Sequence, residues 1–439
     1  MKNLIDKNNM KAALTMATAA LLGPNNVAQA SNTLSNSQDS EWEFDSAFLL
    51  YSEVDRVSAG EVILSGQRTF ENDEVLNVKL TIDALTGASA NGAVAQPTVQ
   101  TFTRPSGKGQ YQIASGNTPL DDTFHDTRVQ LNGQWTQLLE TDYTVSGGFH
   151  LSKEYDYLSL GINGNVAIDF DRKNTTISTG LSFFHDTFSP EGGIPKPLAS
   201  MLIGDSSNPE WDDEFAKTRL GSNDTKTTAE FLFGLTQVIN RRMLMQFNYS
   251  YSMVDGYLTD PFKILSIVDL NGVTQDYIYE SRPRSRLKQS IFTQSLYHFE
   301  TTVLDISYRY MWDDWAIKSH TIDSRYRIPL PNSFGTESYL QPHVRLYQQS
   351  AADFFSPFLF EADSVPVFAS ADYRIGEMTA STFGLNYGML INNGNELGFR
   401  LEYYQQKPKN AGFNEPSVLK EVELYPSIKA IIAQVSYSF

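Results

Sequence analysis

Two histidine–aspartate pairs come nearest in this sequence to a catalytic arrangement. His125 precedes Asp126, and His185 precedes Asp186. A histidine that is oriented by a carboxylate acts as a general base in hydrolases. Adjacent residues of a strand point to opposite faces, however, so neither pair can form a dyad by itself on a strand. No serine motif of the strained-elbow type lies nearby, and we expect a protein that is not an enzyme.

Two acidic runs carry the residue types that bind calcium. They are Asp121-Asp122 and Asp212-Asp213-Glu214. Carboxylate oxygens are good calcium ligands, but neither run has a recognisable ligand spacing. In so acidic a chain we interpret both runs as solvated loop acids. The chain has no cysteine, which excludes disulfides and thiolate metal sites. The sequence therefore predicts neither a metal nor a cofactor.

A dense basic segment could bind phosphate groups. Arg282, Arg284, Arg286 and Lys288 alternate with other residues at the start of an expected strand. Arginine side chains bind phosphate oxygens in a bidentate geometry. At the outer end of a membrane protein, such a segment would contact the lipid and lipopolysaccharide of the outer leaflet. The other interpretation is a solvated basic rim without a ligand.

The overall charge excludes one class of partner. Of the 439 residues, 34 are Lys or Arg and 51 are Asp or Glu, which gives a formal net charge of −17. A nucleic-acid-binding protein needs a positively charged face, so we expect no nucleic-acid partner. The 27 Phe and 22 Tyr residues also argue against a disordered chain.

The first thirty residues have the three parts of a secretory signal. Lys2, Lys7 and Lys11 precede an apolar run over 12–23, and Ala28-Gln29-Ala30 is a typical cleavage site. The apolar run is too short to span a membrane as a helix. We therefore expect a cleaved signal peptide over 1–30 and a short periplasmic segment over 31–43, which leaves no room for an N-terminal plug domain.

After this signal the dominant pattern has a period of two. In the segment 242–254, Met243, Met245, Phe247, Tyr249, Tyr251 and Met253 alternate with mostly polar residues. Such alternation is typical of a strand with one apolar and one polar face. Sixteen segments qualify as strands: 44–51, 61–69, 75–83, 126–138, 142–152, 157–169, 175–186, 226–239, 242–254, 287–299, 301–312, 315–327, 338–349, 378–391, 396–405 and 428–439. Pro342 is the only proline inside an expected strand, where it cannot donate to a ladder.

The lengths of the connections indicate how these strands are arranged. The long connections, 84–125, 187–225, 255–286, 350–377 and 406–427, all follow odd-numbered strands and so fall on one side. The sequence thus predicts an all-β protein, a transmembrane antiparallel β-barrel of about sixteen strands over 44–439. Its short turns would be periplasmic and its long loops extracellular, as in the bacterial outer membrane. Aromatic residues near strand ends would form interfacial girdles: Trp135, Tyr143, Tyr157, Tyr257, Trp312, Trp315 and Tyr403.

The last strand ends on a pattern of its own. Ile431, Ala433, Val435, Tyr437 and Phe439 occupy alternate positions, and the sequence stops on the aromatic residue. This resembles the C-terminal signature by which the barrel-assembly machinery recognises outer-membrane proteins. The other interpretation is an ordinary amphipathic strand that happens to end on phenylalanine.

Charged residues fall on the polar side of several expected strands. In a barrel they would face the lumen, where mixed charges form a constriction that selects solutes by sign. Equally, they could pair with one another and fill a narrow interior. The candidates are Arg128, Arg242, Asp305, Arg309, Arg345, Arg400 and Glu402, with Lys79, Asp83, Asp169 also on this side.

Several segments are similar to a known family. Ser52-Glu53-Val54-Asp55-Arg56-Val57, the run from Asp83 to Ala93 that contains Leu85-Thr86-Gly87-Ala88-Ser89, and the run from His298 through Trp312-Asp313-Asp314-Trp315 to Pro329 resemble domain-of-unknown-function family 3570. The resemblance implies a Gram-negative outer-membrane barrel. It implies no activity and no site residue.

The sequence favours a passive or ligand-selective pore, because a barrel of sixteen strands is wide enough for an aqueous channel. Two other functions stay open. One is a non-conducting barrel that anchors or assembles partner proteins through its long loops. The other, which is less favoured, is a hydrolase at the rim of the barrel.

Overall fold

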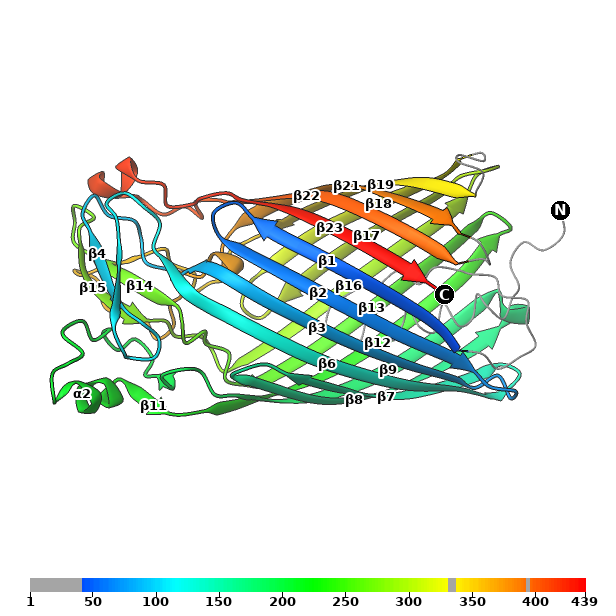
Figure 1. Cartoon of the computed structure of the whole chain (residues 1–439), viewed down its shortest axis with the longest axis horizontal. Helices are drawn as coiled ribbons and strands as arrows, with labels where there is room; N and C mark the ends of the chain where they lie inside the picture. The colour runs from blue at the N-terminus through cyan, green and yellow to red at the C-terminus, as the bar shows by residue number, and fades with distance from the viewer. Residues whose placement is uncertain (1–41, 331–336, 392–394) are drawn as a thin grey trace.

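The computed structural model describes residues 42–330, 337–391 and 395–439, which form a closed antiparallel barrel of sixteen strands (Figure 1). All sixteen expected strands are confirmed. The expected signal peptide and residues 31–41 lie outside the described residues. In barrel order the strands are β1 (Trp42–Glu53), β2 (Val57–Thr69), β3 (Val75–Ala90), β6 (Leu120–Glu140), β7 (Tyr143–Lys153), β8 (Tyr157–Phe170), β9 (Thr175–Phe188), β12 (Asp224–Asn240), β13 (Met243–Gly256), β16 (Ser285–His298), β17 (Val303–Asp313), β18 (Lys318–Leu330), β19 (Ser338–Gln349), β21 (Met378–Leu390), β22 (Glu396–Pro408) and β23 (Ile428–Ser438).

The first and last strands close the barrel. β1 pairs antiparallel with β23 from Asp45↔Ser438 to Glu53↔Ala430. Beyond this ladder, Phe44 and Phe439 exchange two backbone hydrogen bonds of 2.8 Å, and their rings stack. In hydrocarbon an unpaired backbone group costs several kcal/mol, so a spanning sheet must have no free edge. The pairing of β1 with β23 meets this requirement.

Alternate residues of the barrel strands present a large apolar surface to the outside. Phe183, Ile162 and Leu401 expose 50%, 64% and 59% of their surface, and every barrel strand except β16 carries at least one large exposed apolar residue. A continuous apolar surface of this size is unfavourable in water and is typical of the lipid-facing side of an outer-membrane barrel. The fold is therefore a transmembrane β-barrel, as the sequence predicts.

The expected aromatic girdle is only partly right. Trp135, Tyr143 and Tyr403 are exposed on the outer face. Trp315 is instead buried, with 4% of its surface exposed, and packs with Ile317 and Phe355 in the loops. Burial of this ring is a consequence of the loop β19–β21 folding over it, which the local sequence does not reveal.

The five long loops all lie at one end of the barrel, on the left in Figure 1, together with the short β1–β2, β7–β8 and β17–β18 connections. The short turns that follow the other strands lie at the opposite end. Pro342 does lie within a strand. The ladder between β18 and β19 passes from Arg325↔His343 to Ile328↔Leu340 and leaves Pro342 without a partner there. Because proline has no N–H group, it cannot complete that ladder. On its other side Pro342 stays in register with Leu385 of β21.

The long loops contain ordered elements of their own. They are β4 (Gln100–Thr103), β5 (Gln110–Ile113), β10 (Ile194–Pro195), α2 (Trp211–Lys217), β11 (Arg219–Gly221), β14 (Ile264–Val268), β15 (Thr274–Tyr279), β20 (Leu359–Phe360), η3 (Tyr373–Ile375) and η5 (Ser417–Glu421), while η1 (Asp171–Lys173) lies in a short turn. No helix in the described parts of the chain is both long enough and apolar enough to cross a membrane.

The hairpin of β14 and β15 lies at the centre of these loops. Its strand β14 pairs in parallel with β20 of the loop β19–β21. Backbone hydrogen bonds also join the hairpin or its flanking residues to three further loops: Ile264 to Asn91, Met201 to Tyr277 and Val418 to Asn271. The five loops start at points all around the barrel, so their meeting point lies over the extracellular mouth. We call this assembly of five loops the dome.

Buried apolar residues hold the dome together. Phe102, Ile264, Leu265, Val268 and Leu419 expose 1% of their surface or less, and they come from three different loops. Gly92 lies where two loops come closest, with a φ of +99°. A Cβ atom there would lie 2.4 Å from the carbonyl oxygen of Ile264, so this contact requires glycine.

Candidate functional site

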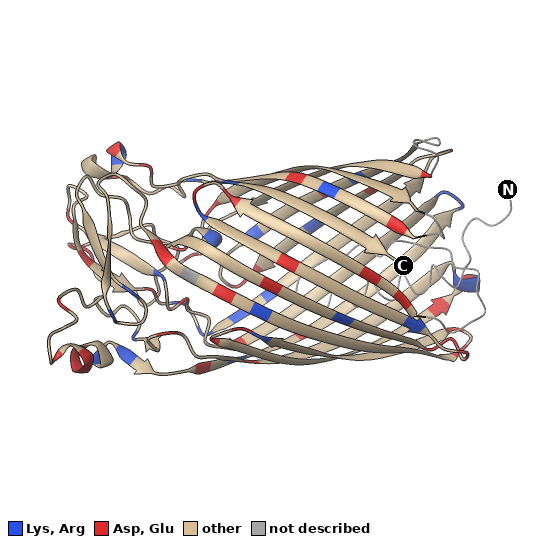
Figure 2. Ribbon diagram, viewed as in Figure 1, with Lys and Arg blue, Asp and Glu red and all other residues tan. Residues whose placement is uncertain are grey.

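Charged residues face the lumen on two opposite parts of the wall. One group lies on β2, β3 and β6, where Arg128 Nε is 2.7 Å from Asp83 Oδ2 and Arg128 Nη2 is 3.8 Å from Glu61. The other group lies on β17 to β22. In the order of sixteen strands, β2, β3 and β6 are eight positions away from β16, β17 and β18, so the groups face each other. Figure 2 shows that acidic and basic residues are distributed along the barrel strands.

A histidine on β19 lies between two carboxylates. His343 Nδ1 is 2.8 Å from Glu402 Oε1, and His343 Nε2 is 3.0 Å from Asp323 Oδ2. Glu402 lies on β22, which is separated from β19 by β21. The residue of β21 in register with both is Gly384, and its missing side chain leaves the space for the contact. Since both acids accept hydrogen bonds from one ring, His343 joins three strands.

The expected lumen residue Asp305 belongs to the same network. Its carboxylate accepts a hydrogen bond of 2.8 Å from Gln294. Arg325 lies 4.0 Å from Asp305 and 3.5 Å from Asp323. The structure thus brings two of the expected lumen residues, Asp305 and Glu402, into one network of paired charges that lines the wall.

The basic lumen residues on this wall differ in their partners. Arg400 donates to Gln434 Oε1 at 2.5 Å. Arg309 lies over the ring of Phe292, with its Cζ 5.5 Å from the ring centroid. Arg345 is exposed. Within the described residues, neither Arg309 nor Arg345 has a carboxylate within ion-pair distance, so both guanidinium groups are available to a solute.

The prediction that Arg242 faces the lumen is wrong. Arg242 lies in the turn between β12 and β13, where its N–H donates to Asn240 Oδ1 at 2.8 Å, and it is exposed. The strand β13 begins only at Met243, because Arg241 and Arg242 form the turn that reverses the chain. Arg242 is therefore at the periplasmic end of the barrel.

The basic segment does not form one outward patch. Arg282 is buried and hydrogen-bonds to Glu280 and Asp372, and Arg286 pairs with Asp313 and lies over Trp315. Only 9% of the Arg282 side chain is exposed. Arg284 is exposed and pairs with Asp224, while Lys288 points into the lumen from β16. The four residues therefore do not share a surface that could bind lipopolysaccharide together.

The two histidine–aspartate pairs form no dyads. His125 Nδ1 is 2.8 Å from Thr86 Oγ1. His185 contacts Thr227, on the outer face, whereas Asp186 accepts from Tyr157 on the lumen face. The members of each pair point to opposite sides of the wall, as the geometry of a strand requires.

The two acidic runs that carry calcium-ligand residue types, and that the sequence favours as solvated loop acids, lie on separate elements, β6 and α2. Asp122 pairs with Arg104 at 3.0 Å, and Asp212, Asp213 and Glu214 form the first turn of α2. A different acidic cluster, Asp126, Glu154 and Asp156, lies at the outer rim. Burial and the Asp126 charge raise the pKa of Glu154 to about 7 and that of Asp156 to about 6.

Sequence reasoning missed the histidine network. His343 is a single histidine within an alternating strand, and its two partners lie on other strands, 20 and 59 residues away in the chain. The only local signal is that His343 occupies the same face of β19 as Arg345, and that glycine occupies the aligned position of the next strand.

The comparison with protein families identifies the chain. The model described as "Protein of unknown function (DUF3570)" matches residues 11–439. The chain belongs to the DUF3570 family. The expected resemblance is thus confirmed, and no curated protein matches this DUF3570 chain.

The solved structures that are similar to this DUF3570 barrel are distant. A bacterial polysaccharide outer membrane secretin has 8% sequence identity, a TM-score of 0.43, and coverage of 91% of this chain and 98% of that chain. OprB of Pseudomonas putida has 9% identity and a TM-score of 0.41, with 91% and 94% covered. The CymD monoaromatic hydrocarbon channel has 9% identity and a TM-score of 0.38, with 92% and 88% covered.

A buried ion cluster fastens two loops of the dome in this DUF3570 chain. Arg282 Nη2 donates to Glu280 Oε2 at 3.0 Å and to Asp372 Oδ2 at 2.7 Å. Arg374 pairs with Asp372 and with Asp260. The arginine charges hold the pKa of the Asp372 carboxyl below its usual range, whereas burial raises the pKa of Glu280 to about 7. The cluster links the loop β13–β16 to the loop β19–β21.

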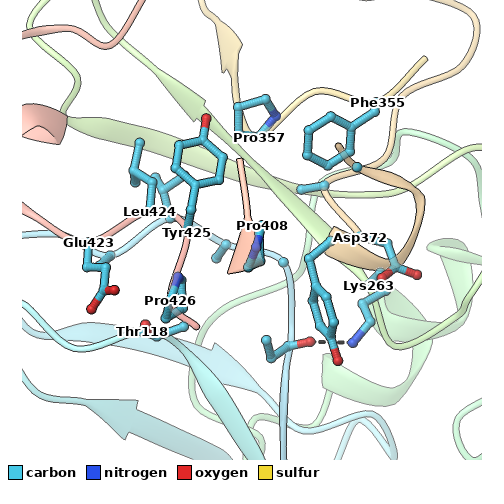
Figure 3. Close-up of a pocket in the computed structure, with 18 of the residues that line it drawn as sticks. Thr118, Lys263, Phe355, Pro357, Asp372, Pro408, Glu423, Leu424, Tyr425 and Pro426 are labelled. Atoms are coloured by element: carbon cyan, nitrogen blue, oxygen red, sulfur yellow. Dashed lines mark hydrogen bonds between the residues drawn. The ribbon is translucent and has the colours of Figure 1, made fainter. Parts of the chain in front are cut away.

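A small cavity lies beside this ion cluster, where four loops of the dome meet the rim of β1 and β2 (Figure 3). Its volume is about 70 Å³, which is enough for one or two waters. The ammonium group of Lys263 on its wall hydrogen-bonds to the carbonyl oxygen of Ala90. Because the one buried cation on its wall, Lys263, already bonds to Ala90, we interpret this cavity as a packing space between the loops of the dome and not as a binding site.

Proposed function

We propose that this protein is an outer-membrane pore that passes small polar solutes through the lumen of its barrel. The observation that carries the proposal is the lumen face of the sixteen strands. It is lined by hydroxyl, amide and charged side chains, including the Arg128 and His343 networks. A barrel of this strand number is wide enough for an aqueous channel unless something fills it.

The dome modifies this proposal. Five loops meet above the mouth and bury apolar residues against one another. A solute from outside would have to pass between or beneath them, so the dome would act as a size filter. Ordered loops at the mouth of a barrel are a common position for selectivity.

A solute-exchange assay tests the pore. Purified protein is reconstituted into liposomes loaded with an impermeant polysaccharide, and the liposomes are diluted into isotonic solutions of small sugars or amino acids. We expect swelling whose rate falls with solute size. A second preparation, in which residues 264–279 are replaced by a short Gly-Ser linker, should swell faster. Absence of swelling in both preparations contradicts the proposal.

A specific observation also favours the second function, a surface anchor for partner proteins. The dome carries exposed apolar side chains, with Leu270 exposing 77% and Val367 exposing 76% of its surface. Exposed apolar residues on an ordered surface are typical of protein contacts. In that case the intact protein would leave liposomes impermeable, and so would the linker variant.

A further inference from the structure

Two arginines on the wall of β17 to β19 form the strongest unassigned site. Arg309 lies on β17 and Arg345 lies on β19, with β18 between them. Arg309 is aligned with Thr321 of β18, which is aligned in turn with Tyr347 of β19. Arg345 lies two residues before Tyr347 on that strand. The register therefore places both arginines on the same lumen face, two strands apart and offset by two residues, where their like charges repel each other. Two like charges in proximity raise the free energy of an empty site, and an anion between them would relieve it.

These two arginines differ from other arginines of the same lumen. Arg128 is held by Asp83, and Arg325 lies between Asp305 and Asp323. Within the described residues, Arg309 and Arg345 have no such acid partner. Asp323 of β18 is in register with Arg345, but its carboxylate is engaged by His343 and Arg325 and forms no ion pair with Arg345.

Tyrosine side chains stand beside this pair. The hydroxyl of Tyr347 donates to Gln349 Oε1 at 2.6 Å, and the hydroxyl of Tyr404 donates to Gln406 Oε1 at 2.8 Å. Tyr347 lies on the same face of β19 as Arg345, and Tyr404 is aligned with Arg345 through Thr382 of β21. The site thus combines two free cations with flat aromatic walls, which is a suitable surface for small organic anions.

The opposite wall supplies uncharged polar groups. β7 and β8 are eight positions from β19 and β21 in the barrel order. On these strands Ser146 and Asn165 are in register and expose 3% and 4% of their surface. The Ser146 hydroxyl and both amide atoms of Asn165 are buried without a hydrogen-bond partner. Buried polar groups normally have partners, so these atoms are suited to an internal water on the wall opposite the two arginines.

We propose that Arg309 and Arg345 form a binding subsite for small oxyanion-bearing solutes, phosphate or carboxylate, within the lumen. This inference rests on the proposed pore, because only a conducting lumen brings solutes past the subsite. Each arginine can donate two parallel N–H bonds to an oxyanion, a geometry that lysine cannot reproduce. The site itself exists in the folded barrel whether or not the barrel conducts.

The test is a binding titration on the full-length folded protein in detergent. Inorganic phosphate and, separately, citrate are titrated calorimetrically into the natural protein, the double variant Arg309→Gln/Arg345→Gln, and the control Arg284→Gln. The control removes an arginine that is exposed at the rim and paired with Asp224. Heat-modifiable gel mobility verifies that each variant is folded.

We expect the double variant to bind the preferred anion at least about tenfold more weakly, which corresponds to about 1.4 kcal/mol, while the control is unchanged. Binding of phosphate but not citrate would identify a phosphate subsite, and binding of citrate but not phosphate would identify a carboxylate subsite. Equal affinity in the double variant, or no binding of either anion by the natural protein, overturns the subsite.

A second measurement separates the subsite from the pore. In bilayers under a salt gradient, the double variant should shift the reversal potential toward cation selectivity and the control should not. Conductance with an unchanged reversal potential overturns the subsite and leaves the pore. Anion binding without any conductance contradicts the pore and leaves the subsite.

Discussion

His343 and Glu402 are hydrogen-bonded at 2.8 Å although a complete strand lies between them. Strands in a sheet are about 4.8 Å apart, so side chains two strands apart meet only where the intervening residue is small. That residue is Gly384, and a Cβ atom there would lie 2.7 Å from Glu402 Cγ. The contact therefore depends on one glycine of β21.

We expect Gly384→Ala to separate His343 from Glu402. The free energy of unfolding of the barrel should fall by roughly 1.5 to 3 kcal/mol, the range for a hydrogen bond to a charged group. The measurement is urea unfolding of the folded protein in detergent. Gly147→Ala is the control, because the nearest atom to its Cβ position is 3.8 Å away. Equal stability of the two variants would show that the pair contributes nothing.

The ion cluster of the dome gives a second prediction. Arg282→Ala would leave Glu280 and Asp372 buried without their shared cation, and removal of one partner from a buried pair costs roughly 3 to 5 kcal/mol. We expect loop cleavage by added protease to become rapid while the barrel stays intact on a gel. Arg284→Ala, which removes an exposed and solvent-screened charge, should cost no more than about 1 kcal/mol. Equal resistance of both variants would contradict this role of the cluster.

The pH dependence of the dome follows from Glu280, whose pKa burial raises to about 7. A raised pKa means that the closed dome binds this proton more tightly than the open one. The stabilisation of the closed dome by protonated Glu280 is complete below the ordinary pKa of 4.5, and it is lost as the pH rises through about 7. We expect amide exchange at Ile264, corrected for the intrinsic rate, to show more opening at pH 8 than at pH 5. Glu280→Gln should remove the difference, and a natural protein with no such difference would contradict the assignment.

The last residue gives a prediction about assembly. The ring of Phe439 stacks on Phe44 and Tyr437 at the seam of the barrel. If the alternate residues that end at Phe439 are the signal for the barrel-assembly machinery, Phe439→Ala should lower the amount of barrel in the outer membrane severalfold. Phe399→Ala, which truncates an outward-facing phenylalanine of β22 that is similarly exposed, should not. Equal levels of both variants in cells would leave Phe439 as an ordinary seam residue.

The barrel could be predicted from the sequence because its solvent imposes a local rule. A lipid-facing strand must alternate, so residues such as Met243, Phe247 and Met253 reveal their strand without knowledge of its neighbours. Loop lengths then give the topology, since long loops on one side fix the parity of every strand.

The dome and the sites could not be predicted in this way. The β14–β15 hairpin lies within an expected loop, because its partners come from four other loops whose positions depend on the closed barrel. The charge of Arg282 favours an exposed rim when the sequence alone is considered, but Glu280 and Asp372 meet this arginine only after the loops fold. The His343 network cannot be predicted for the same reason, since both partners of this histidine are distant in the chain.

The most direct test of the proposed pore is the single-channel conductance of the purified protein in planar bilayers. We predict discrete conductance steps for the natural protein, and larger steps for the variant in which residues 264–279 are replaced by a short linker, because the dome no longer covers the mouth. Silent bilayers for both proteins, with correct folding shown on gels, would contradict a conducting lumen and favour the surface anchor.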